Sequence, residues 1–409
     1  MVRNIKLIFI LLSAVLFAGC SIKEKTTVYE IPSATNNIIT YVTPIPISTP
    51  SPEPEPTPEP NLKATILSAG DVIMHDNVIK SGKVNEDLYD YNSIFNKIKP
   101  YVDEADFSLI SFEGVTLDSD KSYKGFPLFN SPPAIISAIA NTGFNMVNTG
   151  NNHSLDKGLK GLHETRNIIK EQNMQVIGTF NDVAEPRYKI RDLNGIKVGF
   201  LSYTYGCNMN ENRLTQEERE AHLSLIDNEK IMNEIQTLSP NVDLVVVLMH
   251  WGVEYRKEPT NEQKKLADNL LLWGADIVFG SHPHVVEPSE IREVDGEVKY
   301  LIYGMGNFLS NQIGGDNPNE RNNDYTEDGM MISIEIEKNI ETGKTSLISV
   351  KHIPTWVYRY TKNNIYQYSI YPILSLEQID LDVSDSKLVE KLKNSYYRTM
   401  KMVQDYPSE

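Results

Sequence analysis

The sequence predicts an α/β protein in which β-sheets are covered by helices on both faces. Short runs of continuous hydrophobic residues recur between residues 64 and 307, and helical patterns separate most of them. Continuous rather than alternating hydrophobicity indicates strands that are buried on both faces. The segments 131–143 and 261–274 carry helix start and stop signals, with Ser-Pro or Asn at the beginning and Gly at the end. The repeating unit is therefore strand, helix, strand.

Eight hydrophobic runs are expected to form the strands. They span residues 64–71, 106–113, 144–153, 174–179, 196–204, 243–250, 275–282 and 299–307. The segments 329–339 and 345–360 are typical of a β-hairpin or a pair of edge strands, and 386–403 of an amphipathic helix. No composition typical of a linker interrupts residues 64 to 360. We therefore expect one large domain over 63–375, followed by a C-terminal helix and tail over 376–409.

The first 20 residues have the pattern of a secretory signal peptide. A short basic start precedes a hydrophobic run over 7–17, which is too short for the ~20 residues of a comfortable membrane span. Ala18-Gly19-Cys20 resembles the lipobox of bacterial lipoproteins, in which the cysteine is lipidated, although Phe17 stands where Leu is usual. The sequence thus predicts a lipid anchor on Cys20 and a protein held on the outer face of the cell membrane. An uncleaved signal anchor is the alternative.

Residues 21–62 are expected to form a disordered tether rather than a folded layer. Eight of the 22 prolines lie within residues 44–60, and proline favours an extended spacer of ~3.1 Å per residue. The chain has only two cysteines, so a disulfide framework and a cysteine-based zinc site are excluded. If Cys20 is lipidated, Cys207 is unpaired.

The charge balance argues against a nucleic-acid partner. Asp and Glu number 55 against 39 Lys and Arg, for a formal net charge of −16. Binding to a phosphate backbone requires a basic face.

Polar residues that can bind metals or protons gather where the predicted strands end. The set comprises Asp71, Glu113, Asn151, Asn152, His153, His250, His282 and His284, with His75 close behind the first strand. Loops at the carboxyl ends of strands meet at one edge of an open α/β sheet, so these side chains are expected to converge. Imidazole, carboxylate and amide oxygen are ligands of divalent metals. The two imidazoles of the His-Pro-His segment can face the same way in an extended chain.

Each residue also has a purely structural explanation. Asp71 can cap a helix, Asn151 and Asn152 can form an Asx turn, and Glu113 can pair with a lysine. A single histidine in such a loop is more often a surface or capping residue than a ligand. Convergence at five strand ends nevertheless favours a shared site.

The motifs AGDVIMHD, SFEG, NTGNNHSLDKG, MHWGVEY, GADIVFGSHPHVVEP and YGMGNF occur in this order between residues 65 and 310. In this order and spacing they resemble the CapA family of capsule (poly-γ-glutamate) synthesis proteins. That family resembles the calcineurin-like metallophosphoesterases. The resemblance implies a four-layer α-β-β-α sandwich that carries two divalent metal ions, with Mn, Zn or Fe as candidates.

The resemblance also implies roles for individual residues. Metal ligands are expected at Asp71, Glu113, Asn152, His250, His282 and His284, with Glu113 where a bridging aspartate is usual. His153 would donate a proton to the leaving group and Asp156 would orient it. Two departures stand out: His75 follows Asp71 by four residues instead of two, and the bridging position is Glu. One metal site is therefore expected to be altered, weak or absent.

Other residues near strand ends are candidates for substrate contacts. They are Trp251, Glu254, Tyr255, Tyr203, Asn307 and Ser202, with Lys121, Lys124 and Arg256 as a possible basic patch.

Together these patterns predict a membrane-tethered protein that acts in the biosynthesis, attachment or export of an anionic cell-surface polymer. A phosphoesterase-like or amide-cleaving metal-dependent hydrolase is the leading hypothesis, with membrane-embedded synthase components as partners. A non-catalytic factor for polymer binding or synthase assembly, and a metallophosphatase unrelated to capsule, remain open because fold and ligands do not determine the substrate.

Overall fold

The structure is a computed structural model that describes residues 61–314, 325–382 and 385–405. All of them belong to one compact unit, Pro58–Glu409. The expected signal peptide, Cys20 and all but the last two residues of the tether lie outside the described residues. None of the described helices combines the length and the hydrophobicity needed to cross a membrane.

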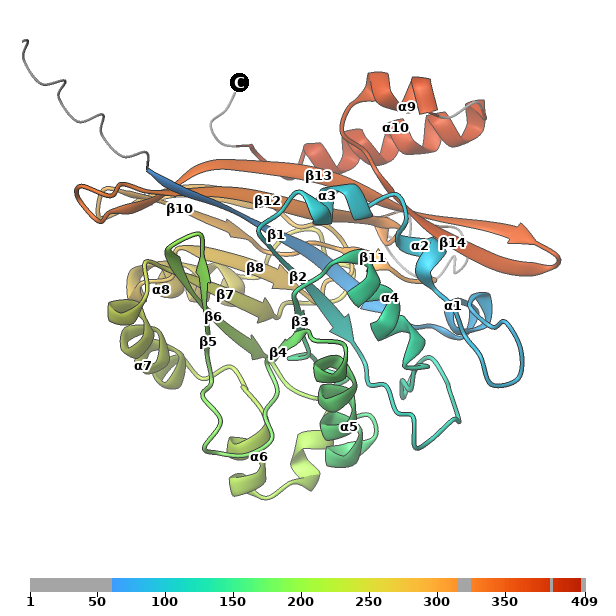
Figure 1. Cartoon of the computed structure of the whole chain (residues 1–409), viewed down its shortest axis with the longest axis horizontal. Coiled ribbons are helices and arrows are strands. Elements are labelled where there is room, and N and C mark those ends of the chain that lie inside the picture. The colour runs from blue at the N-terminus through green and yellow to red at the C-terminus, as the bar shows by residue number, and fades with distance from the viewer. Residues whose placement is uncertain (1–60, 315–324, 383–384, 406–409) are drawn as a thin grey trace, which may run out of the picture. The chain divides into compact units, whose positions relative to one another are not determined.

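Two β-sheets form the centre of this unit (Figure 1). The first sheet contains β1 (Leu62–Ile73), β2 (Phe107–Glu113), β3 (Met146–Asn148), β4 (Gln175–Ile177), β11 (Asn307–Leu309), β12 (Asp328–Lys338), β13 (Thr345–Lys362) and β14 (Ile365–Pro372). Its order is β14-β13-β12-β1-β2-β3-β4, with β11 paired to β1. The second sheet contains β5 (Lys189–Leu193), β6 (Ile196–Thr204), β7 (Leu244–His250), β8 (Ile277–Ser281), β9 (Ser289–Val294) and β10 (Glu297–Ile302). Its order is β5-β6-β7-β8-β10-β9.

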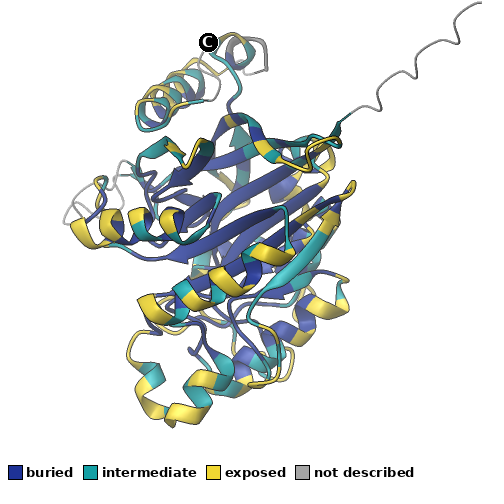
Figure 2. Ribbon diagram, turned by 90° about the vertical axis from the view of Figure 1, so that its left-hand side faces the viewer, coloured by how far each residue is buried: buried dark blue, intermediate teal, exposed yellow. Residues whose placement is uncertain are grey.

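Helices cover the outer face of each sheet, as the burial pattern in Figure 2 also shows. The first sheet is covered by helices that include α1 (Asp76–Ser81), α2 (Asn92–Phe95), α3 (Lys99–Asp103), α4 (Ala134–Thr142) and α5 (Gly158–Glu171). The second is covered by α7 (Asn228–Leu238) and α8 (Asn261–Trp273), while α6 (Gln216–His222) lies in a connection. The inner faces of the two sheets share one hydrophobic core. The predicted four-layer α-β-β-α sandwich is thus confirmed.

Strand β7 shows why the hydrophobic runs are continuous. Leu244, Val246 and Leu248 point into the core between the sheets, whereas Val245 and Val247 point toward α7 and α8. Because successive side chains of a strand point to opposite faces, both faces must be apolar when both are covered. A continuous hydrophobic run in the sequence therefore indicates a strand that is covered on both faces.

The expected strand over 299–307 is wrong in one respect. The chain leaves the second sheet after Ile302 and enters the first sheet at Asn307, which pairs with Asp71. Gly306 between them has a φ of 69°, and a Cβ added there would lie 2.6 Å from the carbonyl oxygen of Asp328. The run is therefore two strands joined by a turn that crosses between the sheets, and hydrophobicity alone does not reveal the crossing.

The expected helix boundaries are nearly right. Helix α4 ends at Gly143, which adopts a left-handed φ of 112°, as its sequence predicts. Helix α8 ends at Gly274 in the same way, but its N-cap is Thr260 rather than Asn261. Thr260 and Gln263 form a reciprocal capping box there.

The C-terminal region is more closely joined to the sandwich than expected. Strand β12 lies between β1 and β13, so the edge strand is β14, which the sequence analysis did not identify. Helices α9 (Leu376–Asp382) and α10 (Ser386–Met400) follow. Leu388 and Leu392 of α10 pack with Trp356 of β13, and Arg398 pairs with the buried Asp328 of β12.

Candidate metal centre

The predicted ligands do converge at one edge of the two sheets. Glu113 and His250 are the last residues of β2 and β7, and Asp71 lies near the end of β1. Asn152 follows β3, while His282 and His284 follow β8. All six side chains are buried. The carboxyl ends of parallel strands from both sheets thus deliver the donors to one place.

Five of these residues form two groups of three that are suited to hold a cation, and Glu113 belongs to both groups. The first group is Glu113, His250 and His282, and the second is Asp71, Glu113 and His284. Within each group the ligand atoms lie within 4.8 Å of one another. A carboxylate shared between two sets of donors can bind two neighbouring metal ions, as in a two-metal centre. Glu254, expected to contact substrate, forms a further group with His282 and His284.

Several buried polar atoms at this place have no hydrogen-bond partner among the described residues. They include Asp71 Oδ1, Glu113 Oε2 and His282 Nδ1. An unpaired buried charge is costly unless it binds a metal or an opposite charge. The unsatisfied donors and acceptors therefore fit divalent cations.

Burial shifts the pKa values of the clustered carboxylates and imidazoles toward their neutral forms. Burial raises the pKa of Asp71 to about 7, although the backbone N–H of His282 donates to its carboxylate at 3.1 Å and opposes the rise. Burial, followed by the charge of Asp71, raises the pKa of Glu113 well above its usual range. Burial also lowers the pKa of His282 to about 3 and that of His250 far below normal. The imidazoles therefore keep free lone pairs, and a bound cation would restore the carboxylates to their charged form.

Hydrogen bonds fix which nitrogen of two histidines faces the cluster. Ser281 Oγ lies 2.9 Å from His250 Nδ1, and Asn307 Oδ1 lies 3.1 Å from His284 Nδ1. The Nε2 atoms are left for the cluster, and His250 Nε2 lies 3.0 Å from Asn152 Oδ1. Partners of this kind orient metal ligands and fix their tautomers. Asn307, expected to contact substrate, is instead fully buried behind His284.

The His-Pro-His segment is held in an unusual backbone conformation. His282 and His284 have positive φ values of 96° and 59°. Non-glycine residues in this region carry strain that persists only where the surroundings enforce it, often at functional sites. The preceding Gly280 is packed so closely that a Cβ there would lie 1.9 Å from the carbonyl oxygen of Tyr303.

The predicted pair of His153 and Asp156 is also brought together. His153 Nδ1 lies 2.8 Å from Asp156 Oδ2, which in turn accepts the backbone N–H of Phe129 at 2.7 Å. His153 Nε2 faces the cluster, 3.9 Å from Glu113 Oε1. The ring of Phe129 packs edge-on against that of His153 with centroids 4.6 Å apart.

His75 does not join either cation group of the described residues. Strand β1 continues through Ile73, so a residue four positions after Asp71 lies at the start of α1. There His75 Nδ1 accepts the backbone N–H of Asn311 at 3.2 Å, and burial lowers its pKa to about 4. The altered spacing thus leaves the Asp71 group with three ligands.

Two residues expected to contact substrate lie in the core instead. Tyr203 is fully buried against the outer helices, and its hydroxyl donates to Glu234 Oε2 at 2.6 Å. Trp251 is buried in the same core and donates to the carbonyl oxygen of Tyr303. These placements correct both expectations. Ser202 is likewise buried and donates to Asn148.

Two residues that sequence reasoning missed, Tyr205 and Asn208, do reach the site. The ring of Tyr205 lies 4.6 Å from that of His282, and Asn208 Oδ1 accepts from Asn152 Nδ2 at 3.4 Å. Both follow the run 196–204 and lie just beyond the last residue of β6.

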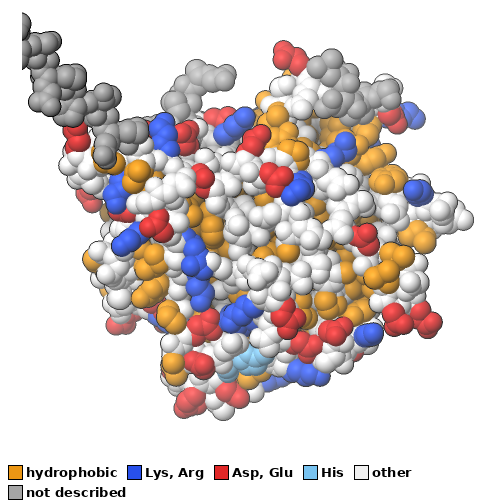
Figure 3. Space-filling view, viewed as in Figure 1, with side chains coloured by type: hydrophobic (Ala, Val, Ile, Leu, Met, Phe, Trp, Pro, Cys, Tyr) orange, Lys and Arg blue, Asp and Glu red, His pale blue; other side chains and the backbone are white. Residues whose placement is uncertain are grey.

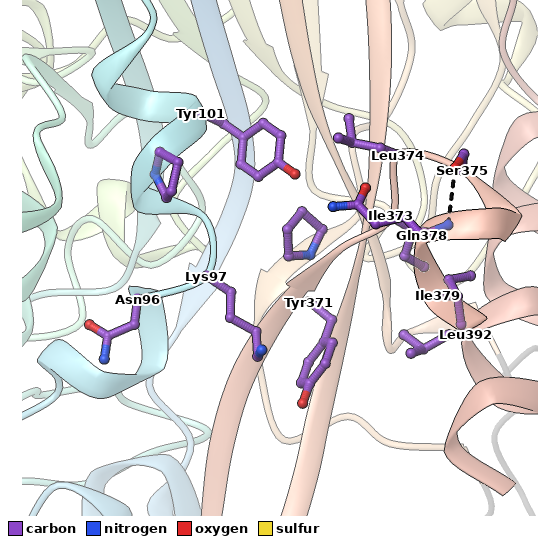
Figure 4. A pocket seen from close by; sticks show the side chains of 12 residues that line it. Asn96, Lys97, Tyr101, Tyr371, Ile373, Leu374, Ser375, Gln378, Ile379 and Leu392 are labelled. Carbon is purple, nitrogen blue, oxygen red and sulfur yellow. Dashed lines mark hydrogen bonds between the residues drawn. The ribbon is translucent and has the colours of Figure 1, made fainter. Parts of the chain in front are cut away.

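Acidic and basic side chains are interspersed on the face in Figure 3, and Lys121 of the expected basic patch pairs with exposed Asp87 at 3.5 Å. A groove of about 380 Å³ (Figure 4) lies between α3 and the C-terminal helices and is lined partly by Lys97, Tyr101 and Tyr371. It contains none of the predicted metal ligands, so we place the functional site at the buried cluster.

Similarity to known proteins covers the part of the chain that contains the buried cluster. A family model described as bacterial capsule synthesis protein PGA_cap matches residues 65–312. Capsule biosynthesis protein CapA of Bacillus anthracis is 30% identical over 263 residues, which cover 62% of this chain and 61% of that protein. PGA biosynthesis protein CapA of Bacillus subtilis is 28% identical over 226 residues, covering 54% and 57%. The matched region thus spans about three fifths of the length of these relatives.

Two solved structures are similar at low identity. A Staphylococcus aureus protein assigned as a 5′-nucleotidase, crystallised with α-ketoglutarate, is 13% identical with a TM-score of 0.43 and covers 81% of this chain and 58% of its own. Sulfate thiohydrolase SoxB of Thermus thermophilus is 11% identical with a TM-score of 0.38, covering 76% and 46%.

Proposed function

We propose, from the premise that this chain belongs to the family of bacterial capsule synthesis proteins PGA_cap, that it acts in the biosynthesis, attachment or export of a poly-γ-glutamate type of polymer. Its working part is a metal-dependent hydrolase-like centre. The curated relatives are named for capsule and PGA biosynthesis, which supports the pathway. The predicted signal peptide and the predicted lipidation of Cys20 support a location at the cell membrane, on its outer face.

The observation that carries this proposal is the position of Glu113 between two groups of donors. We assign Asp71, Glu113 and His284 to one cation, and Glu113, Asn152, His250 and His282 to the other. When bound, divalent cations act as Lewis acids at a phosphoryl or carbonyl oxygen and supply a nucleophile near neutral pH. Burial of the whole set excludes bulk water and strengthens the electrostatic interactions within it.

The chain's own residues supply orientation and a proton. Asp156 accepts from His153 Nδ1 and so leaves Nε2 facing the cluster. His153 would act as the acid in its doubly protonated form, in which Asp156 holds the Nδ1 proton and Nε2 carries the proton that passes to a leaving group beside Glu113. Asn307 Oδ1 accepts from His284 Nδ1 and so holds that ring in the tautomer whose Nε2 is free, while Ser281 Oγ orients the ring of His250.

The proposal predicts two equivalents of divalent metal per chain. Elemental analysis of the full chain, purified in detergent without chelators, measures this number directly. His282→Ala removes a ligand of one group and should lower the content by about one equivalent, with an unchanged circular dichroism spectrum. Absence of metal from the wild-type chain, after attempted loading with Mn, Zn and Fe, would contradict the proposal.

A second expected result separates catalysis from a binding role. His153→Ala should lower the hydrolysis rate by ~10²–10⁴-fold, while metal content stays at the wild-type value because His153 is not one of the assigned ligands. The rate is measured on a panel of phosphoester and γ-glutamyl amide substrates. If polymer production in cells carrying His153→Ala is normal, the centre binds rather than cleaves, as a non-catalytic assembly factor would.

A further inference from the structure

The loop that follows β6, here called the Tyr205–Met209 loop, runs across the cluster. The backbone N–H of Tyr205 donates to the carbonyl oxygen of His250 at 3.0 Å. Farther along, the backbone N–H of Cys207 donates to Glu211 Oε2 at 2.9 Å, and Cys207 Sγ lies 3.8 Å from the carbonyl oxygen of Asn151. The loop is therefore attached to the same strand end and turn that carry the assigned ligands.

Backbone strain accompanies this attachment. Asn208 and Met209 are consecutive non-glycine residues with positive φ values of 50° and 65°. Asparagine tolerates this region, but methionine does so at a cost. The side chain of Met209 is 71% exposed, so its own packing does not explain the strain. The conformation instead brings Asn208 Oδ1 to Asn152 Nδ2 at 3.4 Å.

Tyr205 covers one of the two cation groups. Its ring lies almost parallel to that of His250, with centroids 6.3 Å apart and an interplanar angle of 7°. The same ring lies 4.6 Å from that of His282. Its hydroxyl also interacts with the side chain of Asn152. Three of the four ligands assigned to this cation thus contact Tyr205, whereas His284 of the other group packs on the ring of Tyr255 at 5.7 Å.

Tyr205 also faces solvent. It is 47% exposed, whereas His250 and His282 beneath it are 1% and 3% exposed. A residue buried only for stability would place its hydroxyl in the core, as Tyr203 does with Glu234. Tyr205 instead separates the cation group from solvent on one side.

We infer that Tyr205 is a positioning residue that covers the cation held by Glu113, Asn152, His250 and His282, slows its release and forms the wall that an approaching substrate meets. The inference rests on the proposed metal centre. The Tyr205–Met209 loop places no aromatic ring over the Asp71 group. The two cations should therefore dissociate from the protein at different rates.

Release of Co²⁺ tests this without any assay of turnover. The full chain is loaded with Co²⁺, and loss of its absorption is followed after addition of EDTA. The wild type should release two equivalents in two phases. Tyr205→Ala should accelerate one phase by ~10-fold or more, the scale of losing an outer-shell partner, and leave the other phase unchanged. Tyr205→Phe keeps the ring and should lie between the wild type and Tyr205→Ala.

Tyr360→Ala is the matched control, because Tyr360 is a 39% exposed tyrosine on β13 that takes no part in the cluster. It should release Co²⁺ as the wild type does. Equal release by the wild type and both Tyr205 variants would overturn the inference while the metal centre stands. Failure of the wild type to take up Co²⁺, Mn²⁺ or Zn²⁺ would instead overturn the proposed centre, and this inference with it.

Discussion

Replacing Glu113 by glutamine should abolish the binding of both metal ions at once. Glu113 is the one residue common to the Asp71 group and the His250 group. Glutamine keeps the size of the side chain but removes the charge that both cations require. The affinity for each equivalent should fall by more than the roughly 10- to 100-fold that loss of an outer-shell partner causes. Isothermal titration of the metal-free protein with Mn²⁺ or Zn²⁺ measures both affinities.

The same substitution should have the opposite effect on the metal-free protein. Burial raises the pKa of Glu113 and so opposes its charged form. A neutral amide removes that penalty, so the melting temperature of metal-free Glu113→Gln at pH 8 should equal or exceed that of the metal-free wild type. With metal added, the wild type should gain stability by linkage and the variant should not.

Asp71→Asn provides the control for this experiment. Asp71 belongs to only one of the two groups centred on Glu113, so this variant should lose one equivalent and keep the other. Retention of two equivalents by Glu113→Gln would show that Glu113 is not shared. Equal losses from both variants would show that the two groups do not bind independently.

Replacing Arg398 by alanine should destabilise the protein by about 3–5 kcal/mol, the usual cost of leaving one partner of a buried ion pair uncompensated. Arg398 Nε and Nη2 each donate to Asp328 at 2.8 Å, and Asp328 is only 1% exposed. Ser395 Oγ donates to the same carboxylate at 2.6 Å but carries no charge. This pair joins α10 to β12, so its loss should also loosen the C-terminal helix. Urea unfolding monitored by circular dichroism measures the change.

The stability lost in Arg398→Ala should increase as the pH rises. Burial raises the pKa of Asp328 to about 6, although Arg398 and Ser395 oppose the rise. The folded pKa is above the unfolded model value of 3.8, so protonation favours the folded state. This contribution is fully present below that unfolded value and is lost as pH rises through the folded pKa. Removing Arg398 raises the folded pKa further, so the deficit of the variant should be larger at pH 8 than at pH 5.

Two comparisons make this result specific. Arg398→Ala combined with Asp328→Asn should recover part of the stability, because the buried carboxylate of Asp328 is then replaced by a neutral amide. Lys99→Ala breaks the exposed pair with Asp103 and should cost less than about 1 kcal/mol. A deficit of Arg398→Ala that is the same at pH 5 and pH 8 would show that lost packing, rather than the buried charge, causes it.

The sequence was sufficient to predict the layers and most of the ligands. Two-sided burial imposes a continuous apolar pattern on β2 and β7, and that pattern can be read without a structure. The donors follow these runs because parallel strands deliver their carboxyl ends to one edge. Family motifs then identified Asp71, Asn152 and the His-Pro-His segment as candidates, and the structure brings them together.

Local hydrophobic patterns do not predict which distant parts of the chain come into contact. The run 299–307 divides between two sheets because Asn307 pairs with Asp71, more than 200 residues earlier. Tyr203 and Tyr205 are both tyrosines near the end of β6, yet one meets Glu234 in the outer core and the other meets His250 and His282. Local sequence cannot distinguish them, since the difference depends on what packs against each ring.

The sequence by itself thus determined the α/β class, the strand ends and the chemical types of the donors. Strands buried on both faces must be continuously apolar, and the donors follow directly after these apolar runs. Only the tertiary structure decided that Glu113 lies between two donor groups, that His75 stands outside them and that Tyr205 covers one of them. These features depend on distances between side chains from different strands, which are set when the two sheets pack and not by any single segment.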